Sequence, residues 1–104
     1  MVTAELFKAL GDPTRLEIVQ RLSTGDSYTI SKVSSGLGIT RQGARKHLQM
    51  LADANVIKLE PKGRDTAVIL DNETLKQGKI FIAKLEQQWG TRLKALQQTV
   101  DYEN

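Results

Sequence analysis

Cationic and amide side chains cluster in one short segment that has the spacing of a helix. The segment contains Arg41, Gln42, Arg45, Lys46 and His47. Apolar residues recur at helical spacing through and beyond it, namely Ala44, Leu48, Leu51 and Ala52. One face of such a helix can be buried while the other exposes cations and amides. Arg and Lys donate to guanine O6 and N7, and Gln pairs with adenine. The pattern therefore favours contact with base edges in the major groove of double-stranded DNA.

A second, shorter helix and a tight turn are predicted just before this segment. Thr29 is a suitable N-cap, Gly36 and Gly38 can end the helix, and Thr40 can cap the next one. The polar residues lie in the first turns of the second helix, and they are followed by the apolar residues Met50, Leu51, Ala52 and Ala54. A recognition helix has this polarity. Residues 29–54 are therefore predicted to form a helix-turn-helix.

The other elements are predicted from caps, breakers and changes of period. Gly11 ends a helix over residues 2–10, and Asp12-Pro13 begins a second helix supported by Leu16, Val19 and Leu22. β-Branched runs at 56–60 and 66–70 flank a charged turn at 61–65. This hairpin, a wing over residues 56–70, carries Lys62 and Arg64 at its tip.

A long amphipathic helix is predicted over residues 72–100. Its apolar stripe consists of Leu75, Ile82, Leu85, Trp89, Leu93, Leu96 and Val100. So small a body cannot cover the whole stripe, which makes a second copy its natural cover. The predicted dimer interface is Leu6, Phe7, Ile82, Leu85, Trp89, Leu93 and Leu96. Gly78 and Gly90 each cost the helix roughly 1 kcal/mol relative to Ala, so they permit close helix approach or a bend, or are simply tolerated.

Composition limits the class of protein. The chain has 104 residues, a net charge of +3 and no cysteine, so we expect a single domain over residues 1–104 without disulfides or thiolate metal sites. Residues 40–64 hold six Lys or Arg against two acids, so the basic excess lies there. No apolar run is long enough to span a bilayer, and we expect no membrane association and a cytoplasmic location.

Two stretches also resemble a known family. FKALGDPTRLEIVQRL and ITRQGARKHLQMLADANVIKLEPKGR are similar to the winged helix-turn-helix of the ArsR-type (arsenic-repressor-like) transcriptional regulators. The resemblance covers roughly residues 5 to 100. It implies a homodimer formed through the first and last helices, whose two recognition helices enter successive major grooves of an inverted repeat. It also implies repression.

The chain departs from the metal-sensing members of that family. The short helix before the recognition helix has no thiol, and the last helix has no histidine. The carboxylates Glu73, Glu86, Asp101 and Glu103 lack ligand spacing. We therefore expect no metal and no cofactor, and any effector is unknown.

These observations predict a mainly α fold with a two-stranded β-wing, in the order α-α-α-α-β-β-α, and a dimeric, sequence-specific DNA-binding repressor. The predicted DNA contacts are Thr40, Arg41, Gln42, Arg45, Lys46, His47, Lys62 and Arg64. Arg15 is expected to be structural rather than a DNA contact. Alternatives are a low-specificity DNA binder and a protein-interaction winged helix. Nothing in the sequence supports an enzyme, since a lone His47 without a nucleophile is no catalytic site.

Overall fold

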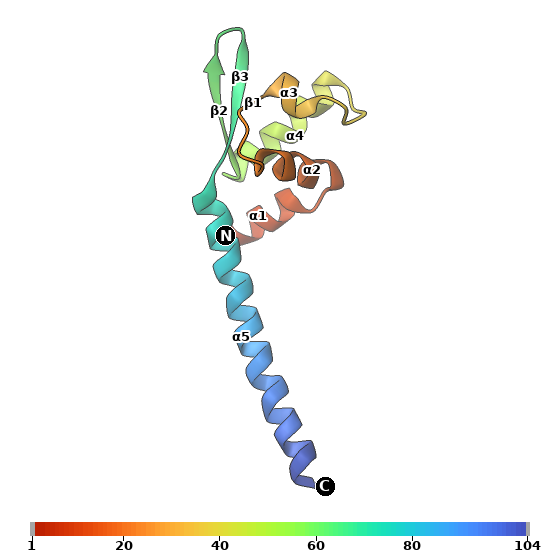
Figure 1. Cartoon of the computed structure of the whole chain (residues 1–104), viewed down its shortest axis with the longest axis vertical. Coiled ribbons are helices and arrows are strands. Elements are labelled where there is room, and N and C mark those ends of the chain that lie inside the picture. Colours follow the sequence, from red (N-terminus) through yellow and green to blue (C-terminus); the bar gives the residue numbers. More distant parts are fainter. Residues whose placement is uncertain (1, 104) are drawn as a thin grey trace.

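The computed structural model describes the backbone of residues 2–103 and the surroundings of the side chains of 3–98. A compact body of four helices and a small sheet carries one long projecting helix (Figure 1). The helices are α1 (Val2–Leu10), α2 (Pro13–Leu22), α3 (Ile30–Ser34), α4 (Arg41–Asp53) and α5 (Asn72–Glu103). The strands are β1 (Tyr28–Thr29), β2 (Ile57–Lys62) and β3 (Asp65–Leu70). The predicted mainly α fold with a β-wing is confirmed.

Side-chain caps define where three of these helices begin. The carboxylate of Asp12 accepts hydrogen bonds from the backbone N–H groups of Thr14 and Arg15 at the start of α2. Thr29 and Thr40 accept the equivalent bonds at the starts of α3 and α4. Each cap satisfies N–H groups that lack a partner within the first helical turn.

The core lies where α2, α3 and α4 meet the sheet. Its largest fully buried side chains are Leu6, Ile18, Val33, Leu48, Leu51 and Val56. Within α2, the buried apolar residues are Ile18 and Leu22, whereas Leu16 is exposed. The inward face of α2 is therefore centred on Ile18. The sequence predicts this helix from Leu16, Val19 and Leu22, a set that does not include Ile18.

The sheet has three strands in the order β1-β3-β2, with both pairs antiparallel. The sequence predicts only the two strands of the wing. β1 is a two-residue strand paired with Ala67 and Val68. The wing turn is also tighter than the predicted 61–65, because β2 and β3 pair as far as Lys62 opposite Asp65. Gly63 follows with a φ of 61°, a conformation that glycine adopts without steric cost.

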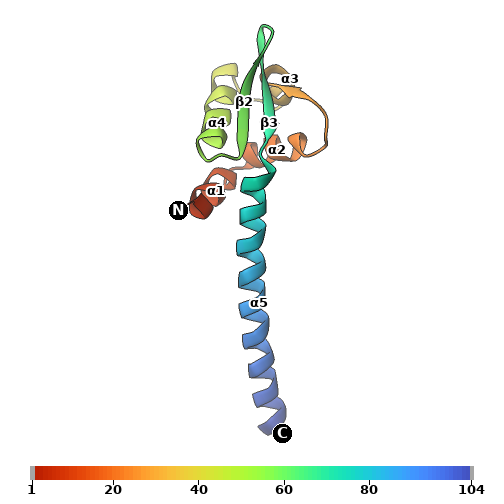
Figure 2. The same ribbon diagram turned by 90° about the vertical axis from the view of Figure 1, so that its left-hand side faces the viewer.

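α5 leaves the body after its first two turns (Figures 1 and 2). Its 32 residues extend for about 48 Å at 1.5 Å per residue, which accounts for most of the 69 Å length of the molecule. α1 packs beside its beginning. A Cβ built on Gly78 would lie 2.6 Å from Cδ2 of Leu6, so this glycine is the point of closest approach, whereas Gly90 has open space around it.

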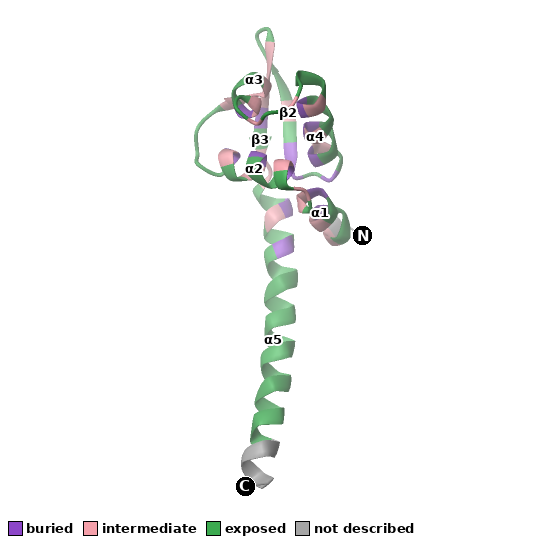
Figure 3. Ribbon diagram, turned by 90° about the vertical axis from the view of Figure 1, so that its right-hand side faces the viewer, coloured by how far each residue is buried: buried purple, intermediate pink, exposed green. Residues whose placement is uncertain are grey.

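From Lys79 to Gln98 every described side chain of α5 is exposed, and Figure 3 shows this part of the helix in green. The exposed large apolar residues include Ile82, Leu85, Trp89, Leu93 and Leu96 of the predicted stripe. The side chain of Val100 lies outside the described residues. Leu6, which the sequence places in a dimer interface, is only 1% exposed. It therefore packs inside its own protomer and supports the α1–α5 contact from within.

Candidate nucleic-acid interface

α4 exposes a polar face at the end of the body opposite to α5. Its buried side is formed by Ala44, Leu48 and Leu51. Arg41, Gln42, Arg45 and Lys46 are all exposed. The start of α4 and the tip of the β2–β3 hairpin both lie at the end of the body away from α5 (Figures 1 and 2). The structure thus brings the predicted contacts of helix and wing to one end of the molecule.

The first turn of α4 is ordered by Thr40. Its Oγ1 accepts a hydrogen bond of 2.9 Å from the backbone N–H of Gly43, and a Cβ at Gly43 would lie 3.1 Å from the same oxygen. The N-cap role of Thr40 is confirmed. The remaining free N–H groups and the helix dipole favour an anion at this end of α4.

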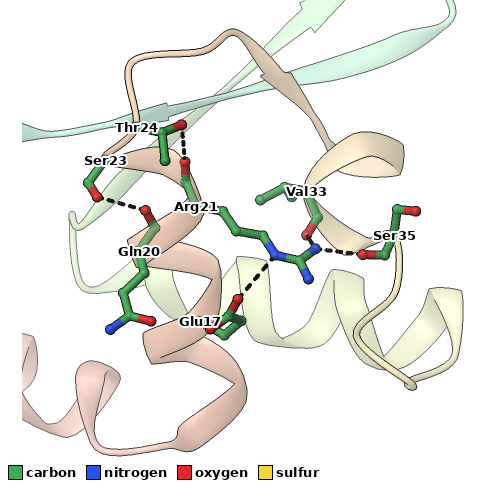
Figure 4. A network of polar contacts seen from close by, with 7 residues as sticks. All are labelled: Glu17, Gln20, Arg21, Ser23, Thr24, Val33 and Ser35. Atoms are coloured by element: carbon green, nitrogen blue, oxygen red, sulfur yellow. Dashed lines mark hydrogen bonds and ion pairs between the residues drawn. The ribbon is translucent and has the colours of Figure 1, made fainter.

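The turn before α4 is held by Arg21 of α2 (Figure 4). One of its Nη groups donates to the carbonyl of Val33 at 3.0 Å and to that of Ser35 at 2.6 Å. Its Nε lies 3.4 Å from the carboxylate of Glu17. These bonds attach the end of α3 to α2, so the position of the turn, and with it the start of α4, is set by α2. The sequence pattern did not identify Arg21, because its partners are backbone carbonyls that periodicity does not show.

His47 is on the flank of α4 that faces α2, where it meets Arg15. Arg15 is only 8% exposed. Its guanidinium donates to the carbonyl of Ala9 at 2.6 Å, to Nδ1 of His47 at 3.1 Å and to Sδ of Met50 at 3.5 Å. The predicted structural role of Arg15 is confirmed. The His47 side chain keeps 25% of its surface exposed, so it combines packing against α2 with access to solvent.

Asp12, the N-cap of α2, lies next to Arg15 and His47. Its Oδ2 lies 3.9 Å from Nδ1 of His47. The pKa of the Asp12 carboxyl lies below its ordinary value, chiefly because the backbone N–H of Arg15 donates to it, with a further contribution from the Arg15 charge. The carboxylate is therefore held in its charged form next to the N-terminus of α2.

The wing exposes its tip and contacts α3 through Asp65, the first residue of β3 after the turn. Lys62 and Arg64 are both exposed. The pKa of Asp65 is lowered because its carboxylate accepts from the backbone N–H of Thr66 and from the hydroxyl of Ser31. The contact with Ser31 links the end of the hairpin to α3, which supports the part of the wing that carries the two cations.

The exposed face of α4 also includes Gln49, which is not among the contacts predicted from the sequence. Gln42, Lys46 and Gln49 follow at steps of four and three and so share one side of the helix. The amide of Gln49 donates to Asp53 at 2.8 Å. The spacing of 42, 46 and 49 is the signal that would have identified Gln49.

Among the described residues there is no group of three or more His, Cys, Asp or Glu that could hold a metal ion. The side chains of Asp101 and Glu103 lie outside those residues. No helix within the described part of the chain is long and apolar enough to cross a membrane.

A short helix, a glycine-containing turn, an exposed basic helix and an adjoining hairpin together define a winged helix-turn-helix, the fold of a class of DNA-binding regulators. A model described as a helix-turn-helix domain matches residues 10–60. The HTH-type transcriptional regulator YuzN of Bacillus subtilis is 39% identical over 77 residues, which cover 68% of this chain and 84% of YuzN. The arsenical resistance operon repressor of Bacillus subtilis is 34% identical over 67 residues, 64% of each chain.

Solved structures agree with these sequence relatives. An ArsR-like transcriptional regulator from Rhodococcus sp. RHA1 superposes with a TM-score of 0.79 and 27% identity, covering 93% of this chain and 91% of that one. The chain belongs to the helix-turn-helix transcriptional regulators of the ArsR type. The resemblance to that family noted in the sequence is confirmed.

Proposed function

We propose that this regulator binds double-stranded DNA as a homodimer, at an inverted-repeat operator, and represses transcription by covering a promoter. The observation that carries the proposal is the exposed row of cations and amides on α4, at the same end of the body as the cationic wing tip. Gln42, Arg45 and Lys46 are the candidates for base edges, and Arg41, Lys62 and Arg64 for phosphates. Thr40 and His47 are further phosphate candidates.

The dimer follows from the exposed stripe of α5. A monomer would leave Leu85, Trp89, Leu93 and Leu96 in water on a helix that projects beyond the body. Exposed apolar patches of this kind are typical of interaction surfaces. The stripe continues the face on which α1 packs at Gly78, because steps of three and four residues connect Gly78 to Ile82, Leu85 and Trp89. Two copies of α5 together with α1 would cover this face in both protomers.

Two such protomers would present their α4 helices in a two-fold related pair. Phosphate contacts would supply salt-dependent affinity, and the first turns of α4 would select the sequence. Repression is supported by the names of two relatives. The Bacillus subtilis relative described above is an operon repressor, and the transcriptional repressor SdpR of the same bacterium is 36% identical over 59 residues.

Neutralising charge on α4 tests the proposal. We would compare the wild type, the double variant Arg45→Ala/Lys46→Ala and the control Lys76→Ala/Lys84→Ala, which removes the same charge from α5. Binding is measured on duplexes enriched from a random library at about physiological salt. We expect severe loss for the α4 variant and near wild-type binding for the control.

Equal loss in both variants would indicate binding through overall charge alone, as in a low-specificity DNA binder. If neutralising α4 had no effect on the protein's regulatory function, a protein-interaction winged helix would replace the proposal.

A further inference from the structure

We propose that Arg15 is a positioning residue for DNA binding. It holds the ring of His47 as the neutral imidazole with its hydrogen on Nε2. Through this ring α4 offers one uncharged donor to a DNA phosphate. This inference rests on the proposed DNA-binding function. It goes beyond that function by assigning a tautomer, a charge state and a second residue on which both depend.

The first step concerns which atom donates between the two side chains. A guanidinium has five N–H donors and no acceptor. At 3.1 Å from an Nη of Arg15, Nδ1 of His47 must therefore accept the hydrogen bond. A neutral imidazole that accepts at Nδ1 carries its hydrogen on Nε2, which leaves Nε2–H as the only donor of the ring.

The second step concerns the competing partner of Nδ1. Oδ2 of Asp12 is 3.9 Å away, beyond hydrogen-bond distance. The same oxygen already accepts from the backbone N–H groups of Thr14 and Arg15, at 2.9 and 3.1 Å. The carboxylate is thus engaged in capping α2, and the bond from Arg15 is the one that determines the state of the ring.

The third step concerns why Arg15 can hold the ring in place. Arg15 is buried, and its Nε is bound at 2.6 Å to the carbonyl of Ala9 at the end of α1. The same Nη that reaches His47 also lies 3.5 Å from Sδ of Met50, one turn further along α4. Arg15 is therefore fixed by its bond to the end of α1 and contacts α4 on two successive turns, at His47 and Met50. It connects the orientation of α4 to the helix that packs on α5.

Two substitutions of His47 separate the two ring nitrogens. Asn places its amide near the position of Nδ1, so His47→Asn can still accept from Arg15 but has no donor at the position of Nε2. Gln reaches the position of Nε2, so His47→Gln keeps a donor there and leaves Arg15 without its partner. We expect His47→Asn to keep the thermal stability of the wild type and to lose about tenfold in DNA affinity per protomer. We expect His47→Gln to keep the DNA affinity and to lose thermal stability.

The charge state has its own measurement. An uncharged donor neutralises no phosphate, so His47→Asn should lower affinity while the slope of log K against log salt stays unchanged. A slope that decreases by about 0.9 per protomer would show that the ring binds as a cation, and would overturn the neutral-donor assignment. Equal effects of Asn and Gln on affinity would overturn the assignment of the donor to Nε2.

The tautomer can be measured without DNA, because His47 is the only histidine of the chain. A two-bond ¹H–¹⁵N correlation spectrum of the free full-length protein, with the ring neutral, should show a protonated Nε2 and an unprotonated Nδ1. Arg15→Met should shift this spectrum toward a mixture of tautomers. An Nδ1–H ring in the wild type, or a spectrum identical in Arg15→Met, would overturn the positioning role.

The outcomes also separate this inference from the proposed function. If Arg15→Met does not fold, the wild-type spectrum and the two His47 variants still decide the matter. If the wild type binds no duplex at all, the proposed function and the phosphate donor fail together, whereas the spectrum reports on the Arg15–His47 bond independently.

Discussion

Replacing Trp89 by Ala should weaken the proposed dimer strongly without affecting the fold of the protomer. Trp89 is 59% exposed in the protomer. On a side chain of on the order of 250 Å² this leaves about 150 Å² that a second copy can cover. At about 25 cal/mol per Å² that area is worth up to about 3.7 kcal/mol in each protomer. Only part of this burial free energy contributes to the affinity of association. Loss of a third of it in each of the two protomers would still raise the dissociation constant more than about 50-fold.

Ile80→Ala is the matched control. Ile80 is 58% exposed on the same helix. It precedes Trp89 by nine positions, or about two and a half helical turns, and therefore lies on the opposite side. Sedimentation velocity over a range of concentrations would measure both variants against the wild type. A dissociation constant for Trp89→Ala within about threefold of the wild type, or an equal effect of Ile80→Ala, would refute the assignment of the stripe to the interface.

Three further predictions concern the helix contact, the α2 cap and the wing. Gly90→Ala should stabilise the protein by up to about 1 kcal/mol in urea unfolding, whereas Gly78→Ala should be clearly less stable than Gly90→Ala, since its Cβ would meet Leu6 at 2.6 Å; equal stabilities would contradict the close contact. Folding lowers the pKa of Asp12, so the charged carboxylate stabilises the folded protein. This contribution to the free energy of unfolding is complete above the ordinary carboxyl pKa and is lost as the pH falls through the lower pKa of the folded state. In urea unfolding between about pH 2 and 5, the free energy of unfolding of Asp12→Asn should therefore decrease less with falling pH than that of the wild type. The same dependence on pH in both proteins would exclude this contribution. Lys62→Ala should weaken binding to all duplexes alike and reduce the salt slope by about 0.9 for each phosphate that is no longer neutralised, while a changed sequence preference would instead indicate base contact.

Much of the fold could be predicted because local signals agree with the tertiary structure. The caps at Asp12, Thr29 and Thr40 are side-chain features that act within three residues. The change from helical to alternating spacing marks the wing. The predictions that fell short depend on packing. β1 has only two residues, too few for any periodic pattern, and its pairing depends on β3 some forty residues later.

The candidate site was predictable only in part, for a related reason. Exposed cations on α4 follow from the helical pattern of the sequence, because the apolar residues determine which side faces the core. The contacts that position α4 do not follow, since Arg15 and His47 are 32 residues apart and Arg21 binds carbonyls rather than side chains. Leu6 shows the same limit: its apolar character fits a dimer interface or a protomer core equally well, and only the close approach at Gly78 distinguishes them.

Selection of duplexes from a random library by the purified wild-type protein, at about physiological salt, tests the central claim most directly. The proposal predicts an inverted repeat whose half-site centres lie about one helical turn, roughly 10 bp, or a multiple apart. Binding without a consensus that fades as salt rises, or no binding, would contradict a dimeric, sequence-specific regulator.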